Sequence, residues 1–365
     1  MTVLNAEITG WGKCLPPAVL SNHDLEKLTD TSDEWITTRT GIKERRISHV
    51  EVSDMAEVAA RRALAAAGKA PADVDLIILG TCTADSLIPS ASSILQHKLE
   101  AYNAAALDLN AACSGFLYSL VVGANMIRAG TNRTVLVIGA EKLHYHLDFT
   151  DRSTAVLFGD GAGAVVLEPT DEPIGLLSSE LGMDGRVWDI LRVPKDGSAG
   201  DVGPPAPADG GIRMNGPEVF RRAVTTMGEA AARTVEAAGL DLDDVDLFIP
   251  HQANVRIIDA AARRLGLPES KVFVNIASYG NTSAATIPVA LTEALEEGRI
   301  SAGDLVVFAA FGAGLSWAAA AVRWGPRVTP IEVSDAELPP PDRDTLDLLQ
   351  PNIDFFGRFL PPGEE

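Results

Sequence analysis

The chain has 365 residues, of which 46% are hydrophobic and 22% charged, so it has the composition of a soluble globular protein large enough for two domains or halves. Its formal net charge of −20 disfavours nucleic acid and anionic membrane as general partners. Three cysteines, no apolar stretch long enough to span a bilayer and no basic-then-apolar N-terminal signal favour a cytoplasmic protein without a disulfide framework.

Two segments, at 66–77 and 237–248, share one pattern. In each, an Ala-rich helical stretch passes through a short turn into an apolar strand. A second echo relates Phe-Gly-Asp-Gly at 158–161 to Phe-Gly-Ala-Gly at 311–314. Because both echoes occur in the same order, we favour an internal duplication over coincidence, in an α/β fold whose central sheets are covered by helices. The predicted parts are an N-terminal half at 1–172, a C-terminal half at 173–325 and a Pro- and acid-rich extension at 326–365.

Cys113 is the first candidate for chemistry. It follows an apolar run at 105–109, predicted to be a short buried strand, and precedes an apolar helical segment at 116–128. The unpaired N–H groups and the dipole at a helix N-terminus favour a thiolate, which is a strong nucleophile. The alternative is an inert buried cysteine, since free cysteines are commonly buried.

Three downstream segments carry side chains that suit a cysteine nucleophile. His251 follows an apolar strand that ends at Pro250, and a helical pattern begins near Asn254, a plausible cap. Asn281 lies in a Gly/Ser/Thr turn before an Ala-rich helix, and residues 311–317 form a glycine-bounded turn whose N–H groups suit an oxyanion. Taken singly, these have structural alternatives: a hydrogen-bonded histidine, a turn asparagine and a simple hairpin.

Cysteine, histidine and asparagine at the ends of buried elements suit thioester chemistry. The cysteine takes an acyl group, while histidine and asparagine hydrogen-bond a thioester carbonyl and so stabilise an enolate. Neither a carboxylate pair nor a zinc-type spacing of cysteine and histidine competes, so no metal site is predicted. The glycines at 159–163 are followed by apolar residues rather than a basic one, which argues against a nucleotide loop.

Taken together, these and other segments closely resemble a β-ketoacyl-acyl-carrier-protein synthase III, of the thiolase superfamily. The matching segments lie in order within residues 3–325, at 31–46, 110–116, 151–154, 158–164, 214–220, 249–254, 279–281 and 311–314. The resemblance implies a thiolase-like five-layered αβαβα fold with two pseudo-repeated halves, and a homodimer.

The resemblance also implies a reaction. Cys113 would be acylated by an acyl-CoA primer, and His251 and Asn281 would hold the thioester carbonyl of a malonyl-acyl carrier protein, or malonyl-CoA, during loss of carbon dioxide. The N–H groups of Cys113 and Ala313 would form the oxyanion hole. The product would be a β-ketoacyl thioester in fatty acid or specialised acyl biosynthesis. No metal or organic cofactor is expected, because decarboxylation itself generates the nucleophile.

Substrate-binding residues are implied in the same way. Trp35 and Arg39, four apart on a predicted helix, would stack with Arg152 on the adenine of CoA, unless they form a cation–π pair within the protein. Gly216 and Asn254 would approach the pantetheine arm. Acidic carrier protein would dock on a basic cluster, for which the alternative is an ordinary solvated face. The cluster comprises Arg221, Arg222, Arg256, Arg263 and Arg264.

Two features depart from the family. Residues 326–365 extend past its usual end and lack a period apart from a weak segment at 345–349, and Phe355, Phe356 and Phe359 there are expected to dock on a surface. Ile88 stands where the family often carries a bulky aromatic that floors the acyl pocket across the dimer interface, so we expect a pocket larger than acetyl requires.

Two other hypotheses remain. One is a ketosynthase III-like acyltransferase or non-standard condensing enzyme of specialised metabolism, which keeps the acyl-cysteine but uses another acceptor. The other, of a different class, is a non-catalytic partner subunit that shapes a pocket for another synthase. The presence of Cys113, His251 and Asn281 argues against the second.

Overall fold

The computed structural model describes residues 4–194 and 211–357. Its N-terminal half is built around a five-stranded sheet, in which β1 lies antiparallel to β7 and β4 runs parallel to both β5 and β6. In spatial order the strands are β1 (Asn5–Cys14), β7 (Asp160–Thr170), β6 (Val135–Lys142), β4 (Leu76–Gly80) and β5 (Ala105–Leu109).

The C-terminal half repeats this arrangement in a four-stranded sheet. Here β8 lies antiparallel to β13, as β1 does to β7, and β11 is parallel to β12, as β4 is to β6. The strands in order are β11 (Leu247–Pro250), β12 (Leu305–Gly312), β13 (Ser316–Arg323) and β8 (Gly175–Met183). The division expected between 172 and 173 falls between β7 and β8.

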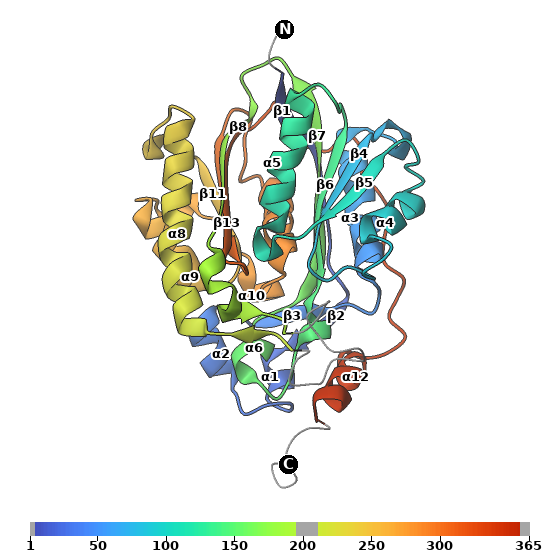
Figure 1. The fold of residues 1–365 in the computed structure, drawn as a ribbon, viewed down its shortest axis with the longest axis vertical. Coiled ribbons are helices and arrows are strands. Elements are labelled where there is room, and N and C mark those ends of the chain that lie inside the picture. Colours follow the sequence, from blue (N-terminus) through green and yellow to red (C-terminus); the bar gives the residue numbers. More distant parts are fainter. Residues whose placement is uncertain (1–3, 195–210, 358–365) are drawn as a thin grey trace.

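Helices form three layers around and between the sheets, in the predicted αβαβα order (Figure 1). The central layer holds α5 (Gly115–Arg128) and α11 (Thr286–Glu296), which are apolar on most sides and therefore buried between the two sheets. The outer layers are α3 (Val52–Ala67) with α4 (Ala91–Leu99) on the first sheet, and α8 (Gly216–Ala237) with α9 (Val255–Arg264) on the second.

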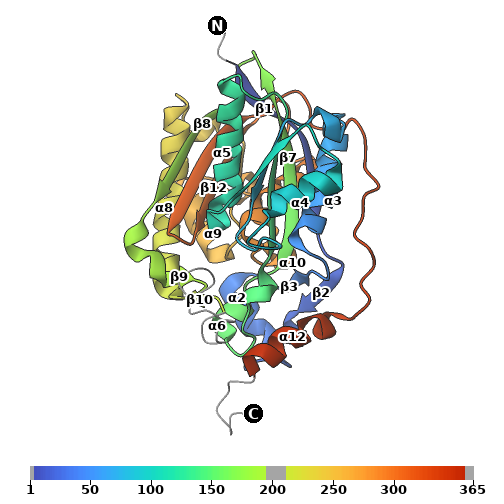
Figure 2. The ribbon, with the colours of Figure 1, turned by 45° about the vertical axis from the view of Figure 1, so that its right-hand side comes forward.

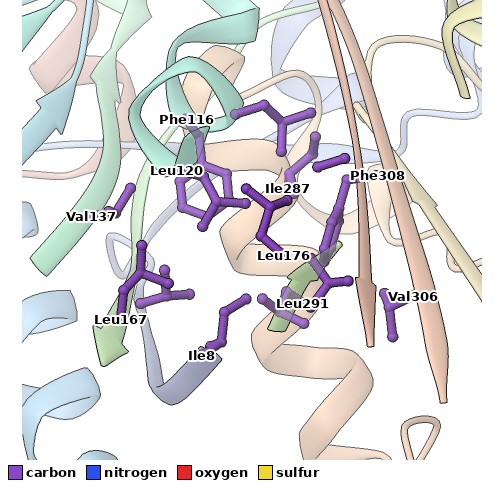
Figure 3. Packing of buried hydrophobic residues seen from close by; sticks show 14 of the residues in the cluster. Ile8, Phe116, Leu120, Val137, Leu167, Leu176, Ile287, Leu291, Val306 and Phe308 are labelled. Carbon is purple, nitrogen blue, oxygen red and sulfur yellow. The ribbon is translucent and has the colours of Figure 1, made fainter. Parts of the chain in front are cut away.

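The core between the sheets is aliphatic and aromatic. Figure 3 shows Phe116 and Leu120 of α5 close to Ile287 of α11, with side chains of both sheets around them. On the outer side of the first sheet, small residues allow closer packing. A methyl group at Gly10 of β1 would lie 2.2 Å from the carbonyl oxygen of Ala63 in α3, so glycine is required there.

Strand β5 corrects one expectation. The run at 105–109 is a strand, as predicted, but it is not buried in the single chain. It pairs with β4 alone, at the edge of the first sheet, and Leu107 is 39% exposed. An apolar run predicts burial only when both faces and both edges of the strand are covered, and that depends on neighbours distant in sequence.

Shorter elements connect and cap the sheets. At the end of the molecule where the strands display the candidate site lie β2 (Ala18–Ser21), α1 (Asn22–Leu25), α2 (Asp33–Thr40), β3 (Glu44–Ile47), η3 (Leu143–His146), α6 (Arg152–Ala155), β9 (Leu191–Arg192), β10 (Arg213–Met214) and α10 (Ile276–Tyr279). The remaining 3-10 turns are η1 (Pro71–Asp73), η2 (Ala112–Ser114), η4 (Gly185–Ile190), η5 (Leu242–Asp244), η6 (Glu269–Lys271) and η7 (Ser283–Ala285).

The described part of the C-terminal extension lies on the folded body and finishes in a helix. Its first part follows α3, where the N–H of Ile331 donates to Ala66 O at 3.0 Å. It then runs along the outside of the molecule to α12 (Thr345–Gly357), as Figure 2 shows. The sequence predicted only a weak segment at 345–349. Helix α12 is longer because its apolar side chains recur at helical spacing through Phe356, which is buried. Phe359 lies outside the described residues.

No helix in the described ranges combines the length and the apolar character needed to cross a membrane.

Candidate active site

A cavity of about 600 Å³ brings the predicted catalytic residues together. Cys113, His251 and Asn281, from three distant parts of the chain, all line it. A second cavity of about 270 Å³ also reaches Cys113 and is lined by Ala313 as well. Cys113 therefore lies where the two cavities meet. Within residues 4–194 and 211–357, no group of three or more His, Cys, Asp or Glu side chains is placed to hold a metal ion.

Cys113 sits in η2, directly before the N-terminus of α5, as the sequence predicts. The end of β12 approaches it closely: a methyl group at Gly312 would lie 2.7 Å from the backbone nitrogen of Cys113. The next residue, Ala313, is the other expected oxyanion donor, and it shares the second cavity with Cys113. The close approach of two glycine-containing segments thus explains why bulky residues are absent here.

The thiolate expectation needs correction. Burial raises the pKa of the Cys113 thiol to about 12, a contact with the Ser283 hydroxyl lowers it, and the Glu141 carboxylate raises it further. Loss of solvation outweighs the favourable helix N-terminus, because a buried thiolate loses the hydration that a charge requires. The resting side chain is therefore a neutral thiol that must lose its proton when it reacts.

His251 follows the last residue of β11, and its N–H donates to Ala309 O of β12 at 2.8 Å. Its Nδ1 lies 2.6 Å from Thr286 Oγ1, and that hydroxyl donates to Ser283 O at 3.0 Å. Since a hydroxyl has one proton, Nδ1–H is the donor to Thr286 and Nε2 is left with a free lone pair. Burial lowers the pKa of His251 to about 3, so the imidazole is neutral.

Asn281 presents a defined end of its amide. Its Oδ1 accepts from the N–H of Ser283 at 2.8 Å, so Nδ2 is the end available to the cavity. The backbone N–H of Asn281 donates to Leu157 O at 2.8 Å, which fixes the residue from the other side. An amide N–H₂ directed into a buried cavity is suited to donating to a carbonyl or enolate oxygen.

The sequence analysis missed a buried carboxylate beneath these residues. Glu141 is the last residue but one of β6 and is 0% exposed. It accepts from Ser283 Oγ at 3.0 Å, from the N–H of Cys82 at 3.1 Å and from Thr81 Oγ1 at 3.2 Å. Burial raises its pKa, and these donors oppose that rise. The available signal was a lone acidic residue at the carboxyl end of an otherwise apolar strand.

Four of the five residues expected to bind CoA line the larger cavity, and Arg152 lies against one of them, Trp35. The guanidinium of Arg39 lies 4.6 Å from the Trp35 ring centroid and that of Arg152 lies 5.2 Å from it. Gly216 lines the same cavity at the start of α8. Asn254 caps α9 through Arg256 N at 2.9 Å and donates to Arg39 O at 3.0 Å, so it joins α9 to α2.

The five arginines of the expected docking cluster are not equally available. Three are paired with carboxylates: Arg221 and Arg222 with Glu218, and Arg264 with Glu229. Arg256 lies over the Phe220 ring at 5.3 Å, and it lines the larger cavity. Among the residues that the structure describes, no carboxylate is paired with Arg256 or Arg263, and both side chains are exposed on α9.

Ile88 lines neither cavity of its own chain. It is 85% exposed in the loop before α4, next to Leu87, which is 90% exposed. Its expected place in a pocket across a dimer interface stays a prediction.

Comparisons with known proteins agree with this geometry. Residues 107–185 match the sequence family described as 3-Oxoacyl-[acyl-carrier-protein (ACP)] synthase III, and residues 235–324 match the family of its C-terminal part. The solved structure of 3-oxoacyl-[acyl-carrier-protein] synthase III from Aquifex aeolicus VF5 superposes with a TM-score of 0.83 at 47% identity. That match covers 87% of this chain and 100% of the other.

Two sequence relatives differ in how much of this chain they match. Beta-ketoacyl-[acyl-carrier-protein] synthase III 2 of Vibrio vulnificus (strain YJ016) is 55% identical over 358 residues, covering 97% of this chain and 98% of its own. Beta-ketoacyl-[acyl-carrier-protein] synthase III of Symbiobacterium thermophilum is 53% identical over 329 residues, covering 89% of this chain and 100% of its own. Some relatives therefore match nearly the whole chain, whereas shorter ones leave part of it unmatched.

Proposed function

Because this chain belongs to the 3-oxoacyl-[acyl-carrier-protein] synthase III family, we propose that it catalyses the decarboxylative Claisen condensation of an acyl-CoA primer with a malonyl-carrier-protein extender. Such an enzyme is an acyltransferase of the condensing type. The observation that carries the proposal is the convergence of Cys113, His251 and Asn281 on one cavity, with a proton acceptor and an amide donor facing a buried thiol.

The first half-reaction acylates Cys113. The thiol sulfur forms a bond to the acyl carbonyl carbon, and the bond from that carbon to the CoA sulfur breaks. The thiol proton passes to His251 Nε2, whose lone pair is free, and leaves on the CoA sulfur. Neutral thiol and neutral imidazole suit this transfer, since no isolated charge has to be buried in the resting site.

The second half-reaction uses the amide of Asn281. When the malonyl group loses carbon dioxide, the electron pair of the broken carbon–carbon bond moves onto the thioester, whose oxygen accepts from Asn281 Nδ2. His251 donates to the same oxygen as its other neutral tautomer: Nδ1 releases its proton to solvent, Nε2 takes one up, and the Thr286 hydroxyl turns to donate to Nδ1. The α-carbon then attacks the acyl group, and the sulfur of Cys113 leaves and regains a proton from solvent.

The two cavities have different roles in this scheme. The larger runs from Trp35 and Arg39 to Cys113, so it suits a long thioester arm whose adenine end remains near the surface. The smaller, beyond Cys113, includes Leu143, Val193 and Ile212 among its walls and suits the acyl chain. Extender delivery by an acidic carrier protein is supported by the unpaired Arg256 and Arg263 on α9.

A homodimer is part of the proposal. Strand β5 leaves one sheet edge open, and Leu107 on it is partly exposed. Nearby, the loop before α4 exposes Leu87 and Ile88, and Tyr102 is 62% exposed before β5. Apolar side chains of this size around an open strand edge are characteristic of a surface that a second copy covers. Ile88 would then reach the acyl pocket of the partner.

A cytoplasmic location is also part of the proposal. Cys14, Cys82 and Cys113 are all free thiols, which supports a reducing compartment. The alternative acyl transfer to another acceptor keeps the acylation step and differs in the second substrate. The alternative of a non-catalytic partner subunit is disfavoured by the complete cysteine, histidine and asparagine set at one cavity.

The decisive experiment combines the purified protein with radiolabelled acyl-CoA and malonyl-carrier protein. We expect an acyl adduct on Cys113 by mass spectrometry, then carbon dioxide release and a labelled β-ketoacyl product. An adduct without a condensed product would favour the alternative acyl transfer. Absence of both adduct and product, in a folded protein, would favour the non-catalytic subunit.

A further inference from the structure

Helix α12 packs against the segment that forms one wall of the smaller cavity. Leu348 and Leu349 of α12 are buried in one apolar cluster. The same cluster includes Leu143, Leu147 and Ile212. The helix is thus part of the core at this end of the molecule, although it follows residues 235–324, which match the family's C-terminal part.

Hydrogen bonds from a buried amide also join α12 to the loop that it packs against. Asn352, on the buried side of α12, donates through Nδ2 to His144 O at 2.7 Å, Tyr145 O at 3.1 Å and Leu147 O at 3.4 Å. Three carbonyls of one short loop therefore converge on a single amide group. Because the site is buried, loss of this donor would leave those carbonyls without that partner and release the loop from the helix.

Phe356 packs against the segment that leads into β10. A methyl group at Gly211 would lie 3.3 Å from the Phe356 ring and 3.4 Å from the Cβ of Asp148. The next residue, Ile212, donates through its N–H to His146 O at 2.9 Å. The loop and the segment before β10 are therefore joined to each other, and α12 packs against both.

The other side of the loop and of Ile212 faces the smaller cavity. Leu143, His146 and Ile212 line the 270 Å³ cavity that reaches Cys113. We propose that α12 is a specificity element, which selects the acyl primer by holding the 143–147 loop and Ile212 in place. This inference rests on the proposed function, because it assigns the smaller cavity to the acyl chain. Asn352 acts here as a positioning residue, since it contacts the loop and not the cavity.

The test compares two amide-to-carboxylate substitutions on the same helix. Asn352→Asp replaces the donor by an acceptor facing three carbonyls, whereas Gln350→Glu makes the same change of charge on an exposed side chain that bonds within α12. For each full-length protein, kcat/KM is measured for straight-chain acyl-CoA primers of two to ten carbons. The KM for malonyl-carrier protein is measured alongside, because a general loss of structure would change it too.

We expect Asn352→Asp to reduce the ratio of kcat/KM for the best primer to kcat/KM for its neighbours in the series by at least threefold. The KM for malonyl-carrier protein should stay unchanged. Gln350→Glu should keep the wild-type profile. Phe356→Leu, which keeps an apolar side chain, provides a second variant should Asn352→Asp not fold, and it should flatten the profile in the same direction.

Two results would overturn the inference: an unchanged primer profile in folded Asn352→Asp or Phe356→Leu, or an equal loss for all primers. Failure of the wild type to condense any primer would instead count against the proposed function, so the two failures are distinguishable.

Discussion

Ser283 links Glu141 to Asn281: its hydroxyl donates to the buried carboxylate at 3.0 Å, and its N–H donates to Asn281 Oδ1 at 2.8 Å. Glu141 and Ser283 come from different halves of the chain. The buried carboxylate of Glu141 therefore lies behind Ser283, and Ser283 orients the amide of Asn281 toward the cavity. The same hydroxyl also lowers the pKa of the Cys113 thiol, so one serine acts on three parts of the site.

Removing the charge of Glu141 should make Cys113 more acidic. After burial itself, the carboxylate is a further cause that raises the pKa of the nearby thiol, so Glu141→Gln should lower that pKa. The rate of Cys113 alkylation by iodoacetamide, measured against pH, reports this pKa. Glu180→Gln, which removes a carboxylate that is bonded to Arg233 and Trp317, is the control. An unchanged midpoint in Glu141→Gln would mean that the carboxyl carries no charge beside the resting thiol.

Asn281→Ala should separate the two half-reactions. Acylation of Cys113 should persist, because the thiol and its proton acceptor remain, whereas decarboxylation should fall by about two to three powers of ten when the donor is lost. Mass spectrometry of the acyl-enzyme and carbon dioxide release from malonyl-carrier protein measure the steps separately. Cys113→Ala is the control that loses the acyl adduct. Parallel losses of both steps in Asn281→Ala would contradict this division.

Stability should fall below neutral pH because of His251. Burial lowers its folded-state pKa to about 3 from an ordinary value of 6.5, so the unfolded chain binds a proton that the folded chain does not. Between those values the unfolded state is favoured as pH falls, by about 1.4 kcal/mol per pH unit for this group. The free energy of unfolding, measured by urea denaturation, should be lower at pH 5 than at pH 7. This difference should be smaller in His251→Gln than in the wild type. An equal decrease in the free energy of unfolding in the wild type and His251→Gln would indicate that His251 is protonated in the folded state.

The unpaired arginines of α9 should govern carrier-protein use. Replacing Arg256 and Arg263 by Glu should raise the KM for malonyl-carrier protein about fivefold or more at low salt, with a smaller effect on acyl-CoA. The difference should shrink at high salt, because screening removes the advantage of the wild type. Arg133→Glu, the same charge change on an exposed residue of the other half, is the control. Equal effects on both substrates would exclude this docking face.

Ile88→Phe should narrow the primer range if a second copy inserts this residue into the acyl pocket. Each methylene that the wild-type pocket accepts contributes about 0.8 kcal/mol, so two extra carbons change kcat/KM about tenfold. We expect the wild type to use primers longer than acetyl-CoA and Ile88→Phe to lose that preference, with the dimer retained by size-exclusion chromatography. A wild type that prefers acetyl-CoA over every longer primer would refute the open pocket.

Much of the site was predictable because its chemistry is carried by local patterns. Cys113 precedes an apolar helix, His251 ends an apolar strand and Asn281 opens a glycine-rich turn, and each pattern predicts its own element. The order of these motifs along the chain was sufficient for the family and therefore for the layered fold. Residue types and spacing by themselves predict only the local elements, because hydrophobic period and turn composition act over a few residues. The family and the five-layered order follow from the resemblance.

The remaining features depended on contacts between distant segments. The protonation of Cys113 follows from how completely the two halves bury it, and the direction of the Asn281 amide from its bond to Ser283. The exposure of β5 and the burial of α12 likewise depend on what lies beside them, which no local pattern specifies. Sequence alone determined which groups are present; tertiary structure decided their charge and orientation, because solvation and hydrogen-bond partners come from residues far along the chain.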